Sequence, residues 1–123
     1  MKGLKVVILP QPIHQNTVKL VELLDSLLRL LEGQFERWIS KPPTKTLERI
    51  SDLKCHLELL KMFAKDDNWK AFTVAYQKRP LSKVMVKQCF YKEADATLVE
   101  SAESLVENIL EETVIWIKSH ELQ

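Results

Sequence analysis

The pattern of apolar and polar positions predicts long helices along most of the chain. Between Asn16 and Ser40, leucine and aromatic residues recur at intervals of three and four, the spacing that lines one face of a helix. This stripe comprises Leu20, Leu24, Leu27, Leu31, Phe35 and Trp38. Other leucines, including Leu23 and Leu30, widen it beyond the arc of about 100° that a one-sided surface helix needs. We therefore expect a central helix with surplus apolar surface for a partner.

Two further segments show helical periodicity before residue 80. One runs from Thr46 to Lys65, with an expected inward stripe of Ile50, Leu53, Leu57, Leu60 and Ala64. The other runs from Trp69 to Lys78, and Asn68 is a suitable N-cap for it. Pro80 marks the end of this second segment.

The clearest helix after the first lies at the acidic end of the chain. Thr97 and Glu100 have the spacing of a capping box, so the helix is expected to begin there. Its expected buried stripe is Leu98, Ala102, Leu105, Ile109 and Trp116.

Two segments lack a clear helical pattern. Residues 1–12 suggest an extended segment, because the run Val6, Val7, Ile8 and Leu9 is rich in β-branched residues and ends at a proline. Residues 81–91 fit a helix, which we favour, or a strand. As a strand, residues 83–89 would pair with residues 4–9. An unpaired strand at 4–9 would need a second copy or a foreign sheet edge.

These segments predict a mainly α protein: a compact bundle of four or five helices with a short N-terminal extended segment. The 123 residues suit a single domain, with the bundle beginning at residue 16. Only Gly3 and Gly33 are glycines, too few for the turns of a sandwich or barrel. Gly33 falls inside the first predicted helix, where it suggests a kink or a close approach.

Charge is distributed unevenly along the chain. Residues 1–92 hold 17 Lys and Arg against 9 Asp and Glu, whereas residues 93–123 hold 1 against 8. The division indicates either a basic surface for a partner or two parts of one domain that attract each other. We favour the internal attraction.

The two cysteines, Cys55 and Cys89, give no disulfide framework or zinc spacing, and we expect both to be buried structural thiols. The chain has no apolar run of about 18 residues and no signal-peptide core. We therefore expect an intracellular protein, cytoplasmic or nuclear, without a membrane segment. No motif indicates a cofactor, a metal site or a small-molecule substrate.

A basic and aromatic region extends from residue 61 to residue 92. Cations bind phosphates, and exposed aromatic rings stack on unpaired bases, so this combination is typical of proteins that bind single-stranded nucleic acid. The candidate residues for this alternative are Lys70, Arg79, Lys83, Lys87, Trp69 and Tyr76. If these aromatic rings are instead buried in the core, only the cationic side chains around them remain exposed.

Arg49 and His56 lie seven residues apart and so share one face of the predicted helix. The pair resembles the arginine–histidine motif of HEPN ribonucleases, which are small helical domains. That resemblance would give His56 a role at the ribose hydroxyl and Arg49 a role at the phosphate. It is confined to these two residues.

The function best supported by the sequence is that of a small helical protein-interaction module, an adaptor or regulatory subunit, rather than an enzyme. Its partner would be another protein or a second copy of the chain. The candidate partner-binding residues are Val6, Val7, Ile8, Leu9, Leu23 and Leu30.

Overall fold

The computed structural model of the protein describes residues 11–37, 41–90 and 96–121. These residues form five α-helices and one 3-10 helix, with no strand among them, which confirms the mainly α class. In chain order the elements are α1 (Gln11–Gly33), η1 (Gln34–Arg37), α2 (Thr44–Lys65), α3 (Trp69–Lys78), α4 (Lys83–Lys87) and α5 (Ala96–Glu121).

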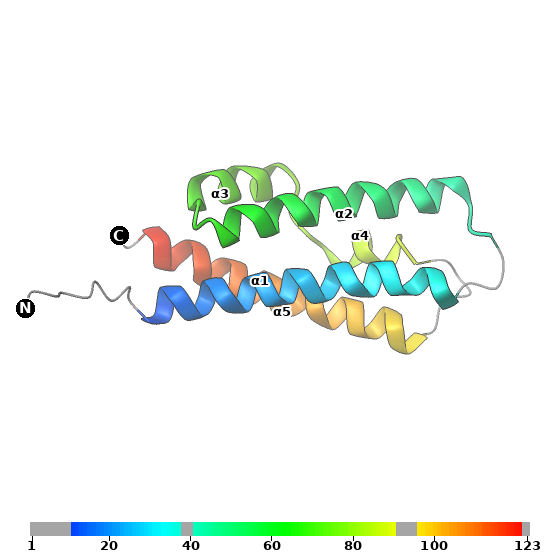
Figure 1. Ribbon diagram of the computed structural model, residues 1–123, viewed down its shortest axis with the longest axis horizontal. Helices are drawn as coiled ribbons and strands as arrows, with labels where there is room; N and C mark the ends of the chain where they lie inside the picture. Colours follow the sequence, from blue (N-terminus) through cyan, green and yellow to red (C-terminus); the bar gives the residue numbers. More distant parts are fainter. Residues whose placement is uncertain (1–10, 38–40, 91–95, 122–123) are drawn as a thin grey trace, which may run out of the picture.

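The three long helices form the body of the bundle (Figure 1). α1 packs against both α2 and α5, so its predicted central position is confirmed. α3 folds back on the end of α2, and α4 packs against α5. The start of α1 and the end of α5 lie at the same end of the bundle, beside α3 (Figure 1).

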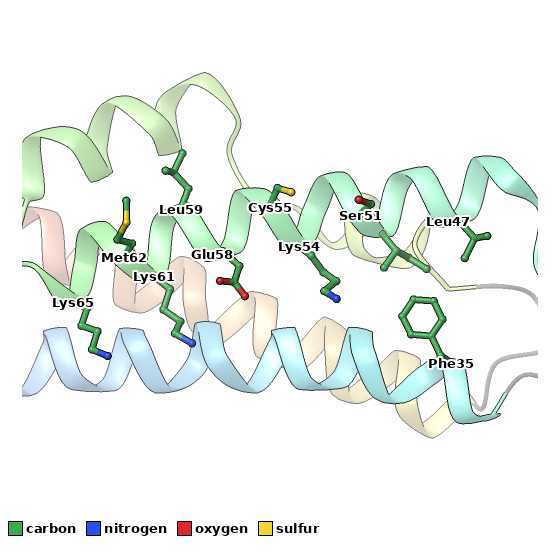
Figure 2. A pocket seen from close by; sticks show the side chains of 11 residues that line it. Phe35, Leu47, Ser51, Lys54, Cys55, Glu58, Leu59, Lys61, Met62 and Lys65 are labelled. Atoms are coloured by element: carbon green, nitrogen blue, oxygen red, sulfur yellow. The ribbon is translucent and has the colours of Figure 1, made fainter.

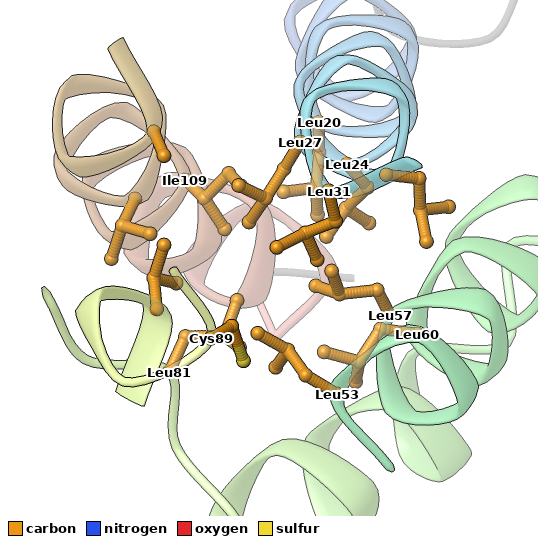
Figure 3. Close-up of a cluster of buried hydrophobic side chains, with 14 of the residues drawn as sticks. Leu20, Leu24, Leu27, Leu31, Leu53, Leu57, Leu60, Leu81, Cys89 and Ile109 are labelled. Atoms are coloured by element: carbon orange, nitrogen blue, oxygen red, sulfur yellow. The ribbon is translucent and has the colours of Figure 1, made fainter. Parts of the chain in front are cut away.

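Leucines of α1 and α2 meet α5 in one continuous core (Figure 3). The predicted α1 stripe is confirmed from Leu20 to Leu31, since Leu20, Leu24, Leu27 and Leu31 are fully buried. The predicted inward stripe of α2 is also buried. In the α5 stripe Leu105 is only half-buried, whereas its other four members are buried.

The stripe of α1 does not continue to Phe35, which is 41% exposed. α1 ends at Gly33, and the chain continues as a 3-10 helix with about three residues per turn, which rotates Phe35 out of line with the leucines. A Cβ atom at Gly33 would meet nothing within 4 Å, so no close approach requires this glycine. Trp38 lies outside the described residues.

Several helix boundaries differ from the sequence predictions. α1 begins at Gln11 rather than Asn16, so residues 11 and 12 belong to the helix and not to an extended segment. α2 begins at Thr44, directly after Pro43, and α5 begins at Ala96, one residue before Thr97. The bounds of α3 are confirmed. The Asn68 side chain caps it by accepting a 3.2 Å hydrogen bond from the amide of Ala71.

The helical interpretation of residues 81–91 is confirmed for Lys83–Lys87, and the alternative of a strand over residues 83–89 is wrong. The Ser82 hydroxyl accepts a hydrogen bond from the amide of Met85 at 3.2 Å and so caps α4. A helix satisfies its backbone groups internally and leaves no ladder for a second strand. Residues 4–9, with the run from Val6 to Leu9, lie outside the described residues.

Ion pairs join the acidic α5 to the basic part of the chain. Lys83 on α4 pairs with Glu107, and Lys19 Nζ on α1 lies 3.4 Å from Glu112 Oε2. The hydrogen bond from Lys83 to Glu107 raises the pKa of that lysine. Both contacts support internal attraction as an explanation of the uneven charge. None of the described helices is long and apolar enough to cross a membrane.

Candidate docking surface

α2 carries apolar side chains on two opposite sides. Its inner stripe is buried in the core, where α2 packs against α1. At 100° per residue, Cys55, Leu59 and Met62 fall on the opposite side of the helix, and Leu47 lies between the two sides. Leu59 is 40% exposed and Met62 is 48% exposed. The bundle covers one side of α2 and leaves the other to solvent.

The larger groove on this exposed side encloses about 880 Å³, and we call it the α1–α2 groove. It is lined by Phe35, Leu47, Ile50, Ser51, Lys54, Cys55, Glu58, Leu59, Lys61, Met62 and Lys65. Figure 2 shows Phe35, in η1 just after α1, extending toward α2, and the side chains of Lys54, Lys61 and Lys65 pointing from α2 toward α1. The groove therefore combines apolar contact surface with a charged edge.

Ion pairs hold the two walls of this groove together. Lys61 Nζ donates to Asp25 Oδ1 at 2.9 Å, and Arg29 lies 2.9 Å from the other oxygen of the same carboxylate. The hydrogen bond from Lys61 lowers the pKa of Asp25, so the carboxylate stays ionised. Lys54 reaches Glu32 at 3.9 Å. These contacts hold Lys54 and Lys61 against α1, while Leu59 and Met62 on the other side of α2 remain exposed.

A second groove, of about 590 Å³, lies between α2 and α3, and we call it the α2–α3 groove. It is lined by His56, Leu59, Phe63, Lys70, Ala71, Val74, Ala75, Lys78 and Arg79. Lys70, Val74 and Lys78 lie four residues apart along α3, and Val74 is 53% exposed. This groove has three cationic side chains in its lining and no acidic one.

Arg79 fixes the end of α3 to α2. Its guanidinium donates two hydrogen bonds to the Asp52 carboxylate, and its carbonyl accepts a 2.8 Å hydrogen bond from His56 Nε2. The hydrogen bond from Arg79 lowers the pKa of Asp52. Burial lowers the pKa of His56 below its ordinary value. The wall of the α2–α3 groove is therefore held by a neutral imidazole and a forked ion pair.

The cysteines differ from the prediction in one respect. Cys89 is buried as expected, and burial raises its pKa to about 11. Cys55 is exposed and lines the α1–α2 groove, because its position on α2 faces away from the core. Among the described residues no cluster of three or more His, Cys, Asp or Glu residues is arranged to bind a metal ion.

The residues of the nucleic-acid alternative are divided between α3 and α4. Lys70 and Arg79 line the α2–α3 groove, whereas Lys83 pairs with Glu107. Lys87 is exposed at the end of α4. The two aromatic residues, Trp69 and Tyr76, are half-buried and pack against the core.

The ring of Tyr76 is stacked on Phe72 inside the protein, with 6.1 Å between ring centroids, and burial raises the pKa of its hydroxyl. Part of each ring is buried against the core, so neither Trp69 nor Tyr76 presents a fully exposed ring on which a nucleic-acid base could stack.

Arg49 and His56 are both on α2, but their environments differ. Arg49 is exposed, whereas His56 is buried and bonded to the carbonyl of Arg79. The groove lined by His56 does not include Arg49.

Leu23 and Leu30 are half-buried and pack against the core. Leu30 also lines a groove between α1 and α5 whose other residues, apart from Leu105, are polar or charged. These leucines therefore lie apart from the two grooves beside α2.

Sequence reasoning missed Leu59 and Val74 as exposed apolar residues. The available signal was the second apolar side of α2, which lies opposite the inner stripe. A comparison of the chain with protein families, with curated proteins and with solved structures finds no match.

Proposed function

We propose that this protein is a small helical protein-interaction module, an adaptor or regulatory subunit of a larger assembly, whose α1–α2 groove receives an amphipathic helix of another protein. One observation carries the proposal: Phe35, Leu59 and Met62 line the same groove and are each 40% exposed or more. Isolated exposed apolar residues are ordinary, but a group of them along one groove is typical of an interaction site.

The length of the groove suits a helix. Its lining runs along α2 from Leu47 to Lys65, which at 1.5 Å per residue spans about 27 Å, or five helical turns. A partner helix with apolar residues at intervals of three and four would place them over Phe35, Leu59 and Met62. Its polar side would then face solvent.

The charged residues at the edge of the α1–α2 groove would fix the direction in which a partner helix binds. Lys65 is exposed at one end of the groove, and Glu58 is exposed near its middle. Lys61 is already bonded to Asp25, so the partner does not have to neutralise it. A partner helix with an acidic residue near Lys65 and a basic residue near Glu58 matches this edge in one direction only.

The test compares three forms of the protein. Leu59→Gln with Met62→Gln removes apolar side chains from the groove, and Val18→Gln makes the same change at an exposed position of α1 outside it. Each form is immobilised and exposed to a native cell extract. We expect a partner that is retained by the wild type and by Val18→Gln and lost with the groove variant.

The partner is then purified and titrated against each form. The groove variant should weaken its affinity at least tenfold, or about 1.4 kcal/mol. Bound partner should also slow the labelling of Cys55, which lies in the groove. The proposal is wrong if no retained protein depends on Leu59 and Met62, or if the purified partner leaves Cys55 labelling unchanged.

A further inference from the structure

Two buried histidines hold α3, one at each of its ends. Asp67, in the turn before α3, contacts His120 of α5. Arg79, directly after α3, contacts His56 of α2 through its carbonyl oxygen. Both histidine side chains are buried. The contacts at the two ends of α3 therefore each involve a side chain whose charge changes near neutral pH.

The two polar contacts of His120 call for a hydrogen on each ring nitrogen. Nδ1 lies 2.7 Å from the carbonyl oxygen of Trp116, and Nε2 lies 2.5 Å from Oδ1 of Asp67. A carbonyl oxygen and an ionised carboxylate accept hydrogen bonds and donate none. A neutral imidazole has a single N–H and satisfies only one of these oxygens, whereas the protonated ring donates to both.

The surroundings of His120 favour the protonated ring. Asp67 supplies an opposite charge from the turn between α2 and α3. The ring centroid of His120 lies 4.1 Å from that of Trp116, and an indole at this distance attracts a cation. A positive charge on the ring is therefore paired on one side and stabilised by an aromatic ring on another.

The other helices around His120 bring neutral groups to this contact. α1 contributes Asn16 and Thr17, which bond to α5, and α3 contributes Phe72, whose ring packs on Trp116. Among the side chains that the structure describes, Asp67 is the one that forms an ion pair with His120. The charged residues next to the contact along the chain are exposed: Asp66, Lys118 and Glu121.

His56 has the opposite requirement. Among the described residues its ring makes one hydrogen bond, from Nε2 to the carbonyl of Arg79 at 2.8 Å, and a neutral ring satisfies it. Burial is the largest influence on this ring and lowers its pKa, while the charges of Arg79 and Asp52 act in opposite directions. The other charged residues of the α2–α3 groove, Lys70 and Lys78, are cationic. A proton on His56 would therefore be a poorly compensated buried charge.

We propose that α3 is held by a proton-dependent clamp, in which its start requires a protonated His120 and its end a neutral His56. When pH rises, the neutral His120 ring gives up one of its two hydrogen bonds, and the start of α3 weakens first. When pH falls, His56 takes up a proton, and the end of α3 weakens first. Both ends are held only over an intermediate range of pH. The clamp concerns the position of α3 and goes beyond the function proposed above.

The first test follows the histidine ring nitrogens of the full chain by NMR as pH changes. A protonated ring gives two similar nitrogen shifts, whereas a neutral ring gives well-separated shifts for its N–H and its bare nitrogen. The chain has three histidines, so the variants His14→Gln and His56→Gln each remove one set of signals and leave the third to His120. We expect a range of pH in which His120 is protonated while His56 is neutral.

Replacement of Asp67 tests the source of this difference. Asp67→Asn removes the negative charge, keeps an oxygen acceptor and tolerates the φ of 57° at this position. His120 should then lose its proton at a lower pH than in the wild type. Asp66→Asn is the matched control, because it makes the same change at the exposed neighbouring position. It should leave the titration of His120 close to that of the wild type.

Amide hydrogen exchange tests whether the two protons act on α3. Each exchange rate is divided by the rate expected for an unfolded chain at the same pH, which gives the protection of each turn. The first turn of α3 should lose protection before the last turn as pH rises, and the last turn before the first as pH falls. In His56→Gln the last turn should keep its protection further into acid.

Three results would overturn the proposal. The first is a bare ring nitrogen on His120 at every pH at which His56 is neutral. The second is a titration of His120 that Asp67→Asn changes no more than Asp66→Asn does. The third is loss of protection at both ends of α3 together in acid and in alkali, since the histidines would then act on the whole fold.

Discussion

Asp67 Oδ1 and His120 Nε2 lie 2.5 Å apart and join the turn between α2 and α3 to the last turn of α5. The imidazole is buried, and its Nδ1 lies 2.7 Å from the carbonyl of Trp116. Asp67 also has a φ of 57°, a conformation that Asp and Asn tolerate better than most residues. One residue therefore shapes the turn and holds the end of α5.

Replacement of Asp67 should separate these two roles. Asp67→Ala loses the hydrogen bond and suits the positive φ poorly, so we expect the free energy of unfolding to fall by about 2 kcal/mol. Asp67→Gly should cost less, since glycine accepts the backbone angle. Asp67→Asn should cost least, because its amide oxygen still accepts from His120. Urea unfolding of the three variants measures this order.

A double-mutant cycle with His120→Ala isolates the contact. The coupling between Asp67→Ala and His120→Ala should be favourable, whereas Asp66→Ala, at the exposed neighbouring position, should show none with His120→Ala. Additive losses for Asp67 and His120 would contradict the assignment.

The Thr17 hydroxyl accepts a 2.8 Å hydrogen bond from the indole Nε1 of Trp116, whose side chain is fully buried. Thr17→Val keeps the shape and removes the acceptor, which leaves the indole N–H without a partner. We expect a loss of about 1–3 kcal/mol in the free energy of unfolding. Thr17→Ser keeps the hydroxyl and should lose less. Equal losses for the valine and serine variants would show that the methyl group matters rather than the hydrogen bond.

The two thiols should react at very different rates in the native protein. With a pKa of about 11, only about one Cys89 in a thousand is a thiolate at pH 8, and the side chain is also buried. Cys55 is exposed. A thiol reagent should therefore modify one cysteine per chain rapidly in buffer and both in denaturant. Cys55→Ser should abolish the rapid phase, and a rapid phase that persists in this variant would contradict the burial of Cys89.

Acid should weaken the fold partly through His56. Burial lowers its pKa from the ordinary value of 6.5, so the unfolded chain takes up this proton before the folded one does. The free energy of unfolding should fall as pH decreases from about 6.5 toward the lowered pKa, by about 1.4 kcal/mol for each unit of lowering. Above this range the contribution is constant.

His56→Gln offers an amide donor to the carbonyl of Arg79 and cannot be protonated in this range. Its stability should therefore decline less than that of the wild type between pH 7.5 and pH 5 in urea unfolding. A decline equal to that of the wild type would show that His56 does not titrate as described.

The leucines of α1 should divide into two groups. Leu24→Ala removes a fully buried side chain and should cost about 2–5 kcal/mol. Leu23→Gln and Leu30→Gln affect half-buried side chains that pack against the core, and we expect about 1 kcal/mol each. If Leu23 and Leu30 instead serve a partner, their replacement will leave the urea midpoint unchanged and weaken partner capture.

Local signals predicted the parts of the fold that depend on local interactions. Asn68 as the cap and Pro80 as the stop placed α3 correctly, and the leucine spacing identified the buried side of α1. Phe35 was misplaced because the change from α to 3-10 geometry after Gly33 alters the direction in which its side chain points. The start of α1 was missed because Asn16 resembles a cap, whereas its amide donates to Ser119 on α5 at 3.2 Å.

The candidate site depended on information that periodicity does not carry. The predicted inward stripe of α2 leaves out Leu59, but only the packing of α1 and α3 against α2 shows that Leu59 is 40% exposed. His56 was noted for its distance from Arg49 along the helix, whereas its actual contact is Arg79, 23 residues away. Such contacts are fixed by how helices fold back on one another.

The contact between α1 and α5 also sets the order in which the protein can fold during synthesis. Thr17 leaves the ribosome 99 residues before Trp116, its partner across the core. Until α5 has emerged, the leucines of α1 have only α2 to cover them, and exposed apolar surface in a growing chain favours aggregation. The bundle therefore closes only after translation of α5, and until then the side of α1 that α5 will cover stays exposed to other chains.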